Sequence, residues 1–194
     1  MISTYEFESE RLGFRRWTEE DKIPFAQMNA DKDVMEFFPK LLTKTESDAF
    51  VGRIEAHFEN FGYALWAIDV KATNEFIGYI GFYSADSDLD FTPCVEIGWR
   101  ISKKNWHKGY ATEGAKACLK YGLDVLNLDE IYSFTSKINV KSINVMEKIG
   151  LVKEREFDHP DIGQESPLKA HVLYKLDINT FKAQKEIINE IRSD

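Results

Sequence analysis

The chain has 194 residues, of which 43% are hydrophobic and 13% aromatic, and its net charge is -8. This length predicts one domain over residues 1–194, the composition excludes a disordered chain, and the acidic balance disfavours nucleic-acid binding through charge. No apolar run approaches the roughly 20 residues that cross a bilayer. Because the N-terminal stretch lacks a signal-peptide pattern and Cys94 and Cys118 are the only cysteines, we expect a cytoplasmic protein that contacts no membrane.

The first third of the chain predicts one strand and two helices. Residues 11–17, "RLGFRRW", alternate as a strand does. Thr18 and Asp21 form a capping-box pattern that predicts a helix reaching about Asn29. Thr45 with Asp48 predicts a second helix start, and Gly62 predicts its end.

The rest of the chain alternates strands and helices. Two β-rich runs around the polar turn "KATNE" predict a hairpin. The expected strands are 63–70, 76–83, 94–102, 130–136, 151–157 and 170–178, and the expected helices are 110 to about 126, 140–150 and a C-terminal tail from 179 to 194. This order predicts an α+β fold with a mixed, mostly antiparallel central sheet of about seven strands and helices on both faces.

The stretch "NWHKGYATEG", residues 105–114, joins an expected strand to an expected helix. The first amides of a helix have no intrahelical acceptor, and the positive end of its dipole lies nearby, so a phosphate group is a suitable ligand. Gly109 permits close approach, while Lys103, Lys104 and Lys108 supply positive charge. The alternative is that Gly109 only makes a turn.

Two common phosphate-binding patterns are absent from this loop. A P-loop requires lysine where Ala115 stands, and the spacing of Gly109 and Gly114 does not fit the dinucleotide pattern G-x-G-x-x-G. The preceding strand contains Gly98, which suggests a bulge that separates this strand from its neighbour. A phosphate site beside a strand with unpaired amides suits coenzyme A, whose pantetheine arm carries two amides and ends in a pyrophosphate.

Three segments in order, "EIGWRISKKNWHKGYATEG", "NVKSINVMEKIGL" and "AHVLYKL", resemble the GNAT N-acetyltransferase superfamily, particularly its RimJ/RimL-like branch. The resemblance extends over nearly the whole chain and implies a GNAT fold whose sheet is splayed between its fourth and fifth strands. The family loop Q/R-x-x-G-x-G/A matches residues 106–111. Trp106 departs from the usual Gln or Arg, but a tryptophan at this position resembles the RimJ/RimL branch.

This resemblance also implies how acetyl-CoA binds. The implied cofactor-binding residues are Trp99, Arg100 and Ile101 along the pantetheine arm, His107, Lys108, Gly109, Tyr110, Ala111 and Thr112 around the pyrophosphate, and Asn139 and Asn144 beside the arm. Helix capping is the alternative role for Asn139, and the two roles are compatible.

Acetyl transfer requires a deprotonated amine, a held carbonyl and a departing thiolate. Glu96 is the candidate base, because a carboxylate can remove the proton of an alkylamine directly or through water. The alternative is a solvated or ion-paired glutamate. Many GNAT enzymes place a tyrosine, the usual proton donor, where this chain has Met146, so Ser142 is the substitute that the resemblance suggests, with first-turn capping as its alternative role.

We therefore expect an N-acetyltransferase that moves acetyl from acetyl-CoA to a primary amine by direct attack. The acceptor is either a protein N-terminus or a small amine, and the protein is a monomer or a homodimer. No metal site is expected, because the four histidines and two cysteines share no ligand spacing. The alternative hypothesis is that the protein is a non-catalytic acyl-CoA sensor with the same fold.

Overall fold

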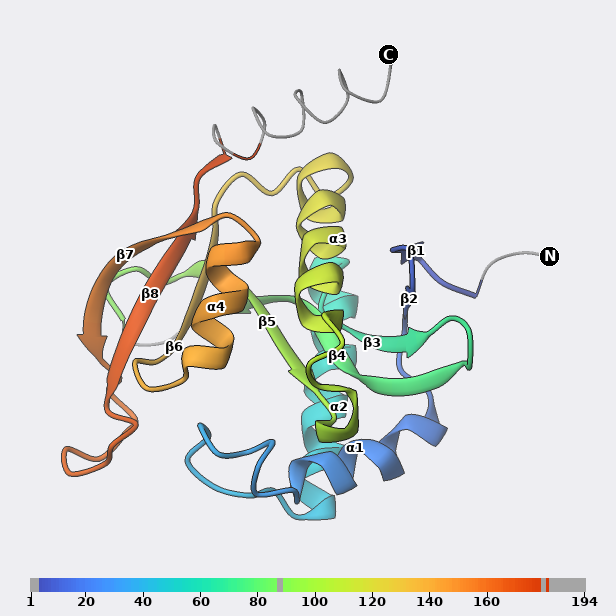
Figure 1. The fold of residues 1–194 in the computed structure, drawn as a ribbon, viewed down its shortest axis with the longest axis horizontal. Coiled ribbons are helices and arrows are strands. Elements are labelled where there is room, and N and C mark those ends of the chain that lie inside the picture. Colours follow the sequence, from blue (N-terminus) through green and yellow to red (C-terminus); the bar gives the residue numbers. More distant parts are fainter. Residues whose placement is uncertain (1–3, 87–88, 179–180, 182–194) are drawn as a thin grey trace.

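The computed structural model describes residues 4–86, 89–178 and 181, and its described strands form one sheet (Figure 1). The strand order in space is β1-β2-β3-β4-β5-β6-β8-β7. The strands are β1 (Phe7–Glu8), β2 (Leu12–Arg15), β3 (Leu65–Val70), β4 (Glu75–Ala85), β5 (Cys94–Ile101), β6 (Ile131–Ser136), β7 (Leu151–Asp158) and β8 (Ala170–Leu176).

All neighbouring strands are antiparallel except β5 and β6, which are parallel. The mixed, mostly antiparallel α+β sheet expected from the sequence is thus confirmed. It has eight strands instead of about seven, because the two-residue β1 is too short to give a periodic pattern. The predicted tail helix over 179–194 lies, except for Phe181, outside the described residues.

Helices cover both faces of the sheet (Figure 1). They are α1 (Lys22–Asn29), α2 (Lys44–Phe61), α3 (Tyr110–Asp124) and α4 (Val140–Lys148). The Tyr79 ring on β4 packs against Phe25 of α1 and Phe50 of α2. A Cβ on Gly114 of α3 would lie 2.3 Å from the Cδ1 atom of Ile80. Since successive strand residues point to opposite faces, α1 and α2 cover one face and α3 the other.

Local signals fix most helix ends. Thr18 and Asp21 form the expected capping box, and Gly62 ends α2 in a left-handed conformation with φ 76°. The predicted start of α2 at Thr45 is wrong by two residues. Thr43 is the cap, and its side chain accepts a hydrogen bond from the amide of Glu46. Thr43 and Thr45 both begin a capping-box pattern, and the earlier one prevails.

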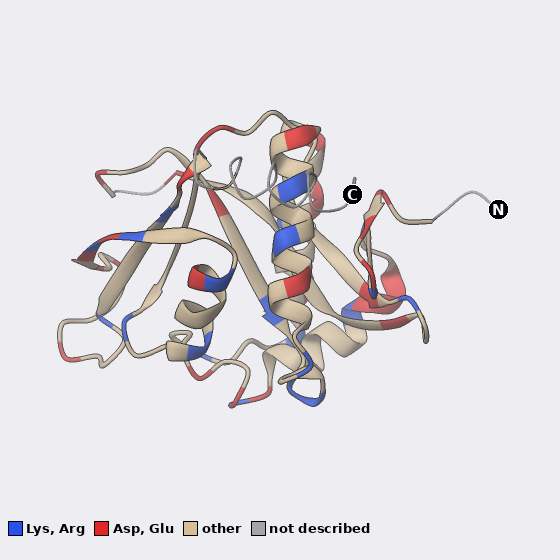
Figure 2. Cartoon of the chain, turned by 45° about the horizontal axis from the view of Figure 1, so that its top comes forward, with Lys and Arg blue, Asp and Glu red and all other residues tan. Residues whose placement is uncertain are grey.

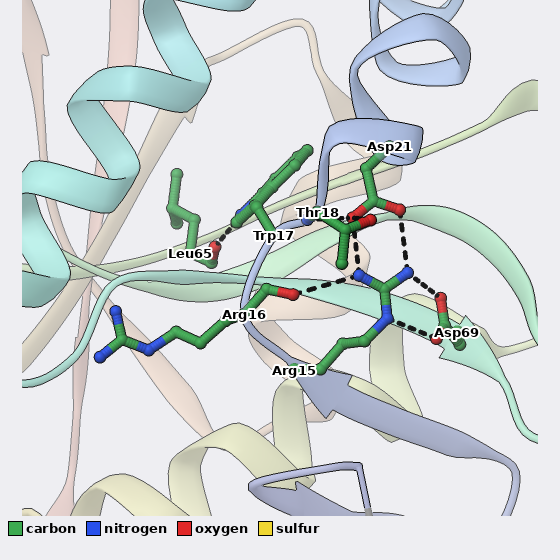
Figure 3. A network of polar contacts seen from close by, with 7 residues as sticks. All are labelled: Arg15, Arg16, Trp17, Thr18, Asp21, Leu65 and Asp69. Carbon is green, nitrogen blue, oxygen red and sulfur yellow. Dashed lines mark hydrogen bonds and ion pairs between the residues drawn. The ribbon is translucent and has the colours of Figure 1, made fainter.

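A buried ion cluster joins β2, β3 and the turn Glu19–Asp21 that precedes α1 (Figure 3). Arg15 forms salt bridges of 2.6 Å with both Asp21 and Asp69. Its guanidinium also donates to the carbonyl of Arg16. The cluster therefore fixes the start of α1 against β2 and β3.

Candidate active site

The strands β5 and β6 separate soon after they meet. Their parallel pairing covers Val95 with Ile131 and Glu96 with Tyr132, and the hydroxyl of Ser133 then donates to the carbonyl of Ile97 at 2.9 Å. Beyond this point the two strands diverge (Figure 1). The structure thus shows the splay that the family resemblance implies between the fourth and fifth expected strands.

The bulge predicted at Gly98 is wrong. Pairing between β4 and β5 runs without a register shift from Cys94 to Ile101, with Gly98 opposite Gly81. β6 instead pairs with β8 along Tyr132 to Ser136. Because each of the two strands follows its outer neighbour, the sheet opens between them without a bulge in β5.

Alternation along β5 sets which backbone groups face this opening. The amide of Ser102 donates to the carbonyl of Ile77, so the ladder pattern turns the main-chain groups of Arg100 and Gly98 toward β4. Those of Ile97, Trp99 and Ile101 consequently face the side of β6. The carbonyl of Ile101 accepts from the indole Nε1 of Trp106 at 2.7 Å. Trp99 is left with its amide and carbonyl toward the opening.

The loop before α3 presents a run of amides. The helix begins at Tyr110, and its first hydrogen bond joins the amide of Glu113 to the carbonyl of Gly109 at 3.0 Å. Positive φ angles at His107 (60°) and Gly109 (81°) turn the chain sharply there. No described residue accepts a hydrogen bond from the six amides of residues 107–112. The described residues thus leave these amides without an acceptor, an arrangement that suits an anion at the start of a helix.

Basic side chains surround the same helix end, as the blue segments of the loop below α3 show (Figure 2). Lys108 donates to Asn105 at 2.8 Å, and Lys104 pairs with Glu75 at 2.9 Å. Arg11, which the sequence did not point to, pairs with Glu113 at 2.6 Å, and its guanidinium lies 4.6 Å from the centre of the Tyr110 ring. The contact spans 102 positions, so no local pattern could reveal it.

Asn139 and Ser142 form the start of α4. The Asn139 side chain accepts from the Ser142 amide at 3.2 Å and donates to the hydroxyls of Thr135 at 2.9 Å and Ser142 at 3.1 Å. Capping is therefore an observed role of Asn139, and the hydroxyl of Ser142 accepts a bond while keeping its own proton. Asn144 is exposed on α4, whereas Met146 is buried.

Glu96 lies on the face of β5 that points toward α1 and α2, because it pairs with Tyr83, four residues along β4 from Tyr79. The residue is half-buried, and its carboxyl has neither an ion pair nor a hydrogen bond among the described residues. Burial raises the pKa of this carboxyl to about 8. At neutral pH a large share of the group is protonated, and it becomes a base in mildly alkaline solution.

The expected site residues therefore fall into two groups. Trp99, Ile101 and residues 107–112 line the end of β5 and the start of α3, while Glu96 and the side chain of Arg100 lie on the α1 and α2 face. The Nζ atom of Lys141, on α4, lies 4.5 Å from the Trp106 ring, which places the start of α4 beside the loop.

Two further features concern metal and membrane. Within residues 4–86, 89–178 and 181, no group of three or more His, Cys, Asp or Glu side chains could hold a metal ion. The same residues include no helix long and apolar enough to cross a membrane.

Comparison with known proteins assigns this arrangement to a class of acetyl-transferring enzymes. A family model described as an acetyltransferase (GNAT) domain matches residues 11–152. The uncharacterized N-acetyltransferase YnaD of Bacillus subtilis is 31% identical over 151 residues, which cover 77% of this chain and 84% of YnaD. The chain belongs to the GNAT acetyltransferase family, and it is an acetyl-CoA-dependent transferase.

Two other similarities are informative. The crystal structure of a GNAT-family acetyltransferase from Bacillus anthracis superposes with a TM-score of 0.72 at 29% identity, covering 87% of this chain and 96% of that one. The spermidine N(1)-acetyltransferase of Escherichia coli K12 is 41% identical over 59 residues, which are 30% of this chain and 32% of that enzyme.

Proposed function

We propose that this protein acetylates a primary amine by direct attack of the amine on acetyl-CoA, as a member of the RimJ/RimL-like branch. The observation that carries the proposal is the run of six unclaimed amides at residues 107–112 beside the opened edge of β5. The branch assignment is supported by the position of Trp106, whose indole donates to Ile101 and whose ring contacts Lys141.

The donor site fits coenzyme A in two respects. Free amides, two positive φ angles and nearby Lys108 and Arg11 suit a pyrophosphate, which carries negative charge and several acceptor oxygens. The carbonyl of Trp99 and the amide of Ile101, which both face the opening, suit the amides of a pantetheine arm lying in the place of a missing strand. Asn144 is exposed, and the side chain of Asn139 already caps α4. Both residues would therefore contribute only secondary contacts to the pantetheine arm.

Bound acetyl-CoA supplies the activated acetyl group as a thioester. Glu96 takes a proton from the incoming ammonium group, directly or through water. Its raised pKa of about 8 is closer to the pKa of an alkylamine than the pKa of an ordinary carboxyl is, which favours this proton transfer. The amide of Trp99, which faces the opening, is oriented to donate to the acetyl oxygen as negative charge develops there.

The departing sulfur requires a proton or a hydrogen-bond donor. Ser142 can supply one, because its oxygen already accepts from Asn139 and its proton remains available. Cys94 is an unsuitable nucleophile, since burial and the nearby carboxylates raise the pKa of its thiol to about 11. These two points favour direct transfer over an acetylated enzyme.

Two acceptor classes follow from the resemblances. The RimJ/RimL-like segments favour a protein N-terminus, and the similarity to the E. coli spermidine acetyltransferase favours a small amine. A non-catalytic acyl-CoA sensor is the rival function, and it is favoured by Met146 at the usual tyrosine position and by the use of Ser142 in the helix cap.

The deciding experiment incubates the purified protein with acetyl-CoA and a panel of peptides, amino acids and polyamines. Release of free coenzyme A that depends on an added amine supports the transferase. Thermal stabilisation by coenzyme A without any amine-dependent release supports the sensor. Gly109→Ala is the matched loop variant, because a residue with a side chain is strained at φ 81° and should weaken the stabilisation by coenzyme A.

A further inference from the structure

A second charged residue lies on the same face of β5 as Glu96. Arg100 is four residues further along this strand and pairs with Tyr79, so its side chain points toward α1 and α2. Only 7% of its surface is accessible. Neither the proposed base nor the proposed donor site uses this side chain.

The guanidinium of Arg100 is poorly satisfied. It has five N–H groups, and the described residues provide one acceptor, the side-chain oxygen of Asn29. The Nδ2 atom of Asn29 donates in turn to the hydroxyl of Ser47 at 2.8 Å. The Nε atom is buried without a hydrogen-bond partner, and no described carboxylate forms a salt bridge with Arg100. A buried cation without a counter-ion is costly, so its retention points to a ligand.

The surroundings of the guanidinium are aromatic. Its Cζ atom lies 4.1 Å from the ring centre of Phe38, 5.5 Å from that of Tyr79 and 5.7 Å from that of Phe50. Phe38 belongs to the loop between α1 and α2 and remains 37% exposed. Salt bridges from Asp33 to Lys103 and from Glu36 to Lys141 fasten this loop across the end of β5 and the start of α4.

We propose that Arg100 recognises a carboxylate on the acceptor, so that the amine substrate is of the amino-acid type and not a polyamine. This inference rests on the proposed function and narrows its acceptor class. A planar guanidinium with free N–H groups matches a carboxylate in shape and charge. The aromatic rings exclude water and strengthen that contact, and the same unpaired positive charge repels a polycation.

The test measures kcat/KM for amino acids, each beside its carboxamide and its decarboxylated amine, such as phenylalanine, phenylalaninamide and phenethylamine, with spermidine added. We expect the wild type to prefer a carboxylate-bearing amine by about 10- to 100-fold. Arg100→Gln should remove this preference, mainly by raising the KM of the amino acid, and should lower kcat/KM for the decarboxylated amine far less. Arg100→Lys should restore part of it.

Arg53→Gln is the matched control, because Arg53 is exposed and stacks on the same Phe50 ring at 5.3 Å. It should leave the preference unchanged. The inference is overturned if kcat/KM for the decarboxylated amine, the carboxamide or spermidine equals or exceeds kcat/KM for the amino acid. It is also overturned if Arg100→Gln lowers kcat/KM for every acceptor by the same factor.

A binding measurement covers the case in which the Arg100 variants do not fold. In the presence of coenzyme A, N-acetylphenylalanine should raise the melting temperature of the wild type more than N-acetylphenethylamine does. Equal shifts, or none, contradict the role of Arg100. If amines without a carboxylate give the fastest release of coenzyme A from acetyl-CoA, this inference fails and the proposed function stands. If no amine causes any release, both fail.

Discussion

Two arginines of this protein, the half-buried Arg15 and the buried Arg100, have opposite surroundings. Arg15 uses all five of its N–H groups, with four bonds to Asp21 and Asp69 and one to the carbonyl of Arg16 (Figure 3). Arg100 uses one, to an uncharged amide. The hydrogen bonds of Arg15 raise the pKa of its guanidinium, a sign that the fold holds the charged form firmly.

The same contrast separates two regions of the sheet. The charged groups beside β2 and β3 neutralise one another. On the face of β5 that points toward α1 and α2, by contrast, neither Glu96 nor Arg100 forms a salt bridge with a described residue. Buried polar groups with a structural role usually have all their hydrogen-bond partners within the protein. Buried polar groups that lack such partners are concentrated where ligands bind. The following variants sharpen or break this distinction.

The largest effect is expected from Glu96→Gln. Removal of the proposed base should lower kcat/KM at pH 8 by about 10²- to 10⁴-fold and abolish the rise of the wild-type rate toward pH 8. Steady-state rates between pH 6 and 9.5 provide the measurement. An unchanged pH profile would exclude Glu96 as the base.

The same variant has a stability consequence with a definite sign. The unfolded carboxyl loses its proton near pH 4.5, whereas the folded one keeps it up to about pH 8. The stability of the wild type should therefore fall as pH rises through this window. Glu96→Gln should remove that loss, so its melting temperature should match the wild type near pH 4 and exceed it at pH 9.

Arg15→Met should have the next largest effect. It leaves two buried carboxylates without their cation, which costs about 3–5 kcal/mol of unfolding free energy. Urea unfolding provides the measurement. Arg155→Met, which removes a surface pair with Asp90, is the control and should cost less than about 1 kcal/mol. Similar losses in both variants would refute the structural role of the Arg15 cluster.

Arg100→Met should change the unfolding free energy by less than about 1 kcal/mol, or increase it, because an unpaired buried charge is replaced by an apolar chain of similar length. The measurement is the same urea titration. A loss comparable to that of Arg15→Met would show that Arg100 is a structural residue, and the contrast between the two arginines would disappear.

Ser142→Ala should have the smallest effect. The capping bond that the Ser142 amide donates to the Asn139 side chain remains, so only the bond between the two side chains, worth about 1 kcal/mol, is lost. If Ser142 donates the proton to sulfur, the rate falls several-fold while the KM for acetyl-CoA stays constant. Ser166→Ala, which removes a turn hydroxyl bonded to the Leu168 amide, serves as the control. Equal rates in both variants would remove Ser142 from the mechanism.

Local signals in the sequence predicted most elements, and their limits are physical. The capping box at Thr18, the glycine at 62 and the alternation along residues 11–17 each act within a few residues, and they gave correct elements. Thr43 with Glu46 fits the capping-box pattern S/T-x-x-E/Q better than Thr45 with Asp48, and Thr43 is the observed cap. The bulge expected at Gly98 does not form, because β6 follows β8 and no strain in β5 is needed to open the sheet.

The candidate site was predictable only where it is local. The loop 107–112 could be found from its glycine and its position before a helix, while Arg11 beside that loop and Asn29 beside Arg100 depend on contacts between distant segments. The lack of a counter-ion for Arg100 is invisible in a sequence that contains 33 acidic residues. Only the packed structure shows which of them come near.

The parting of β5 and β6 has a kinetic consequence. The unclaimed amides lie at the start of α3, on one face of the sheet, and Glu96 and Arg100 point to the other face. With the donor and acceptor sites proposed above, the two substrates would approach from opposite sides of the sheet and meet in the gap between β5 and β6. Neither substrate would then have to leave before the other enters. Initial-rate plots in the two substrates should consist of intersecting lines, the pattern of a ternary complex, whereas parallel lines would indicate a ping-pong reaction.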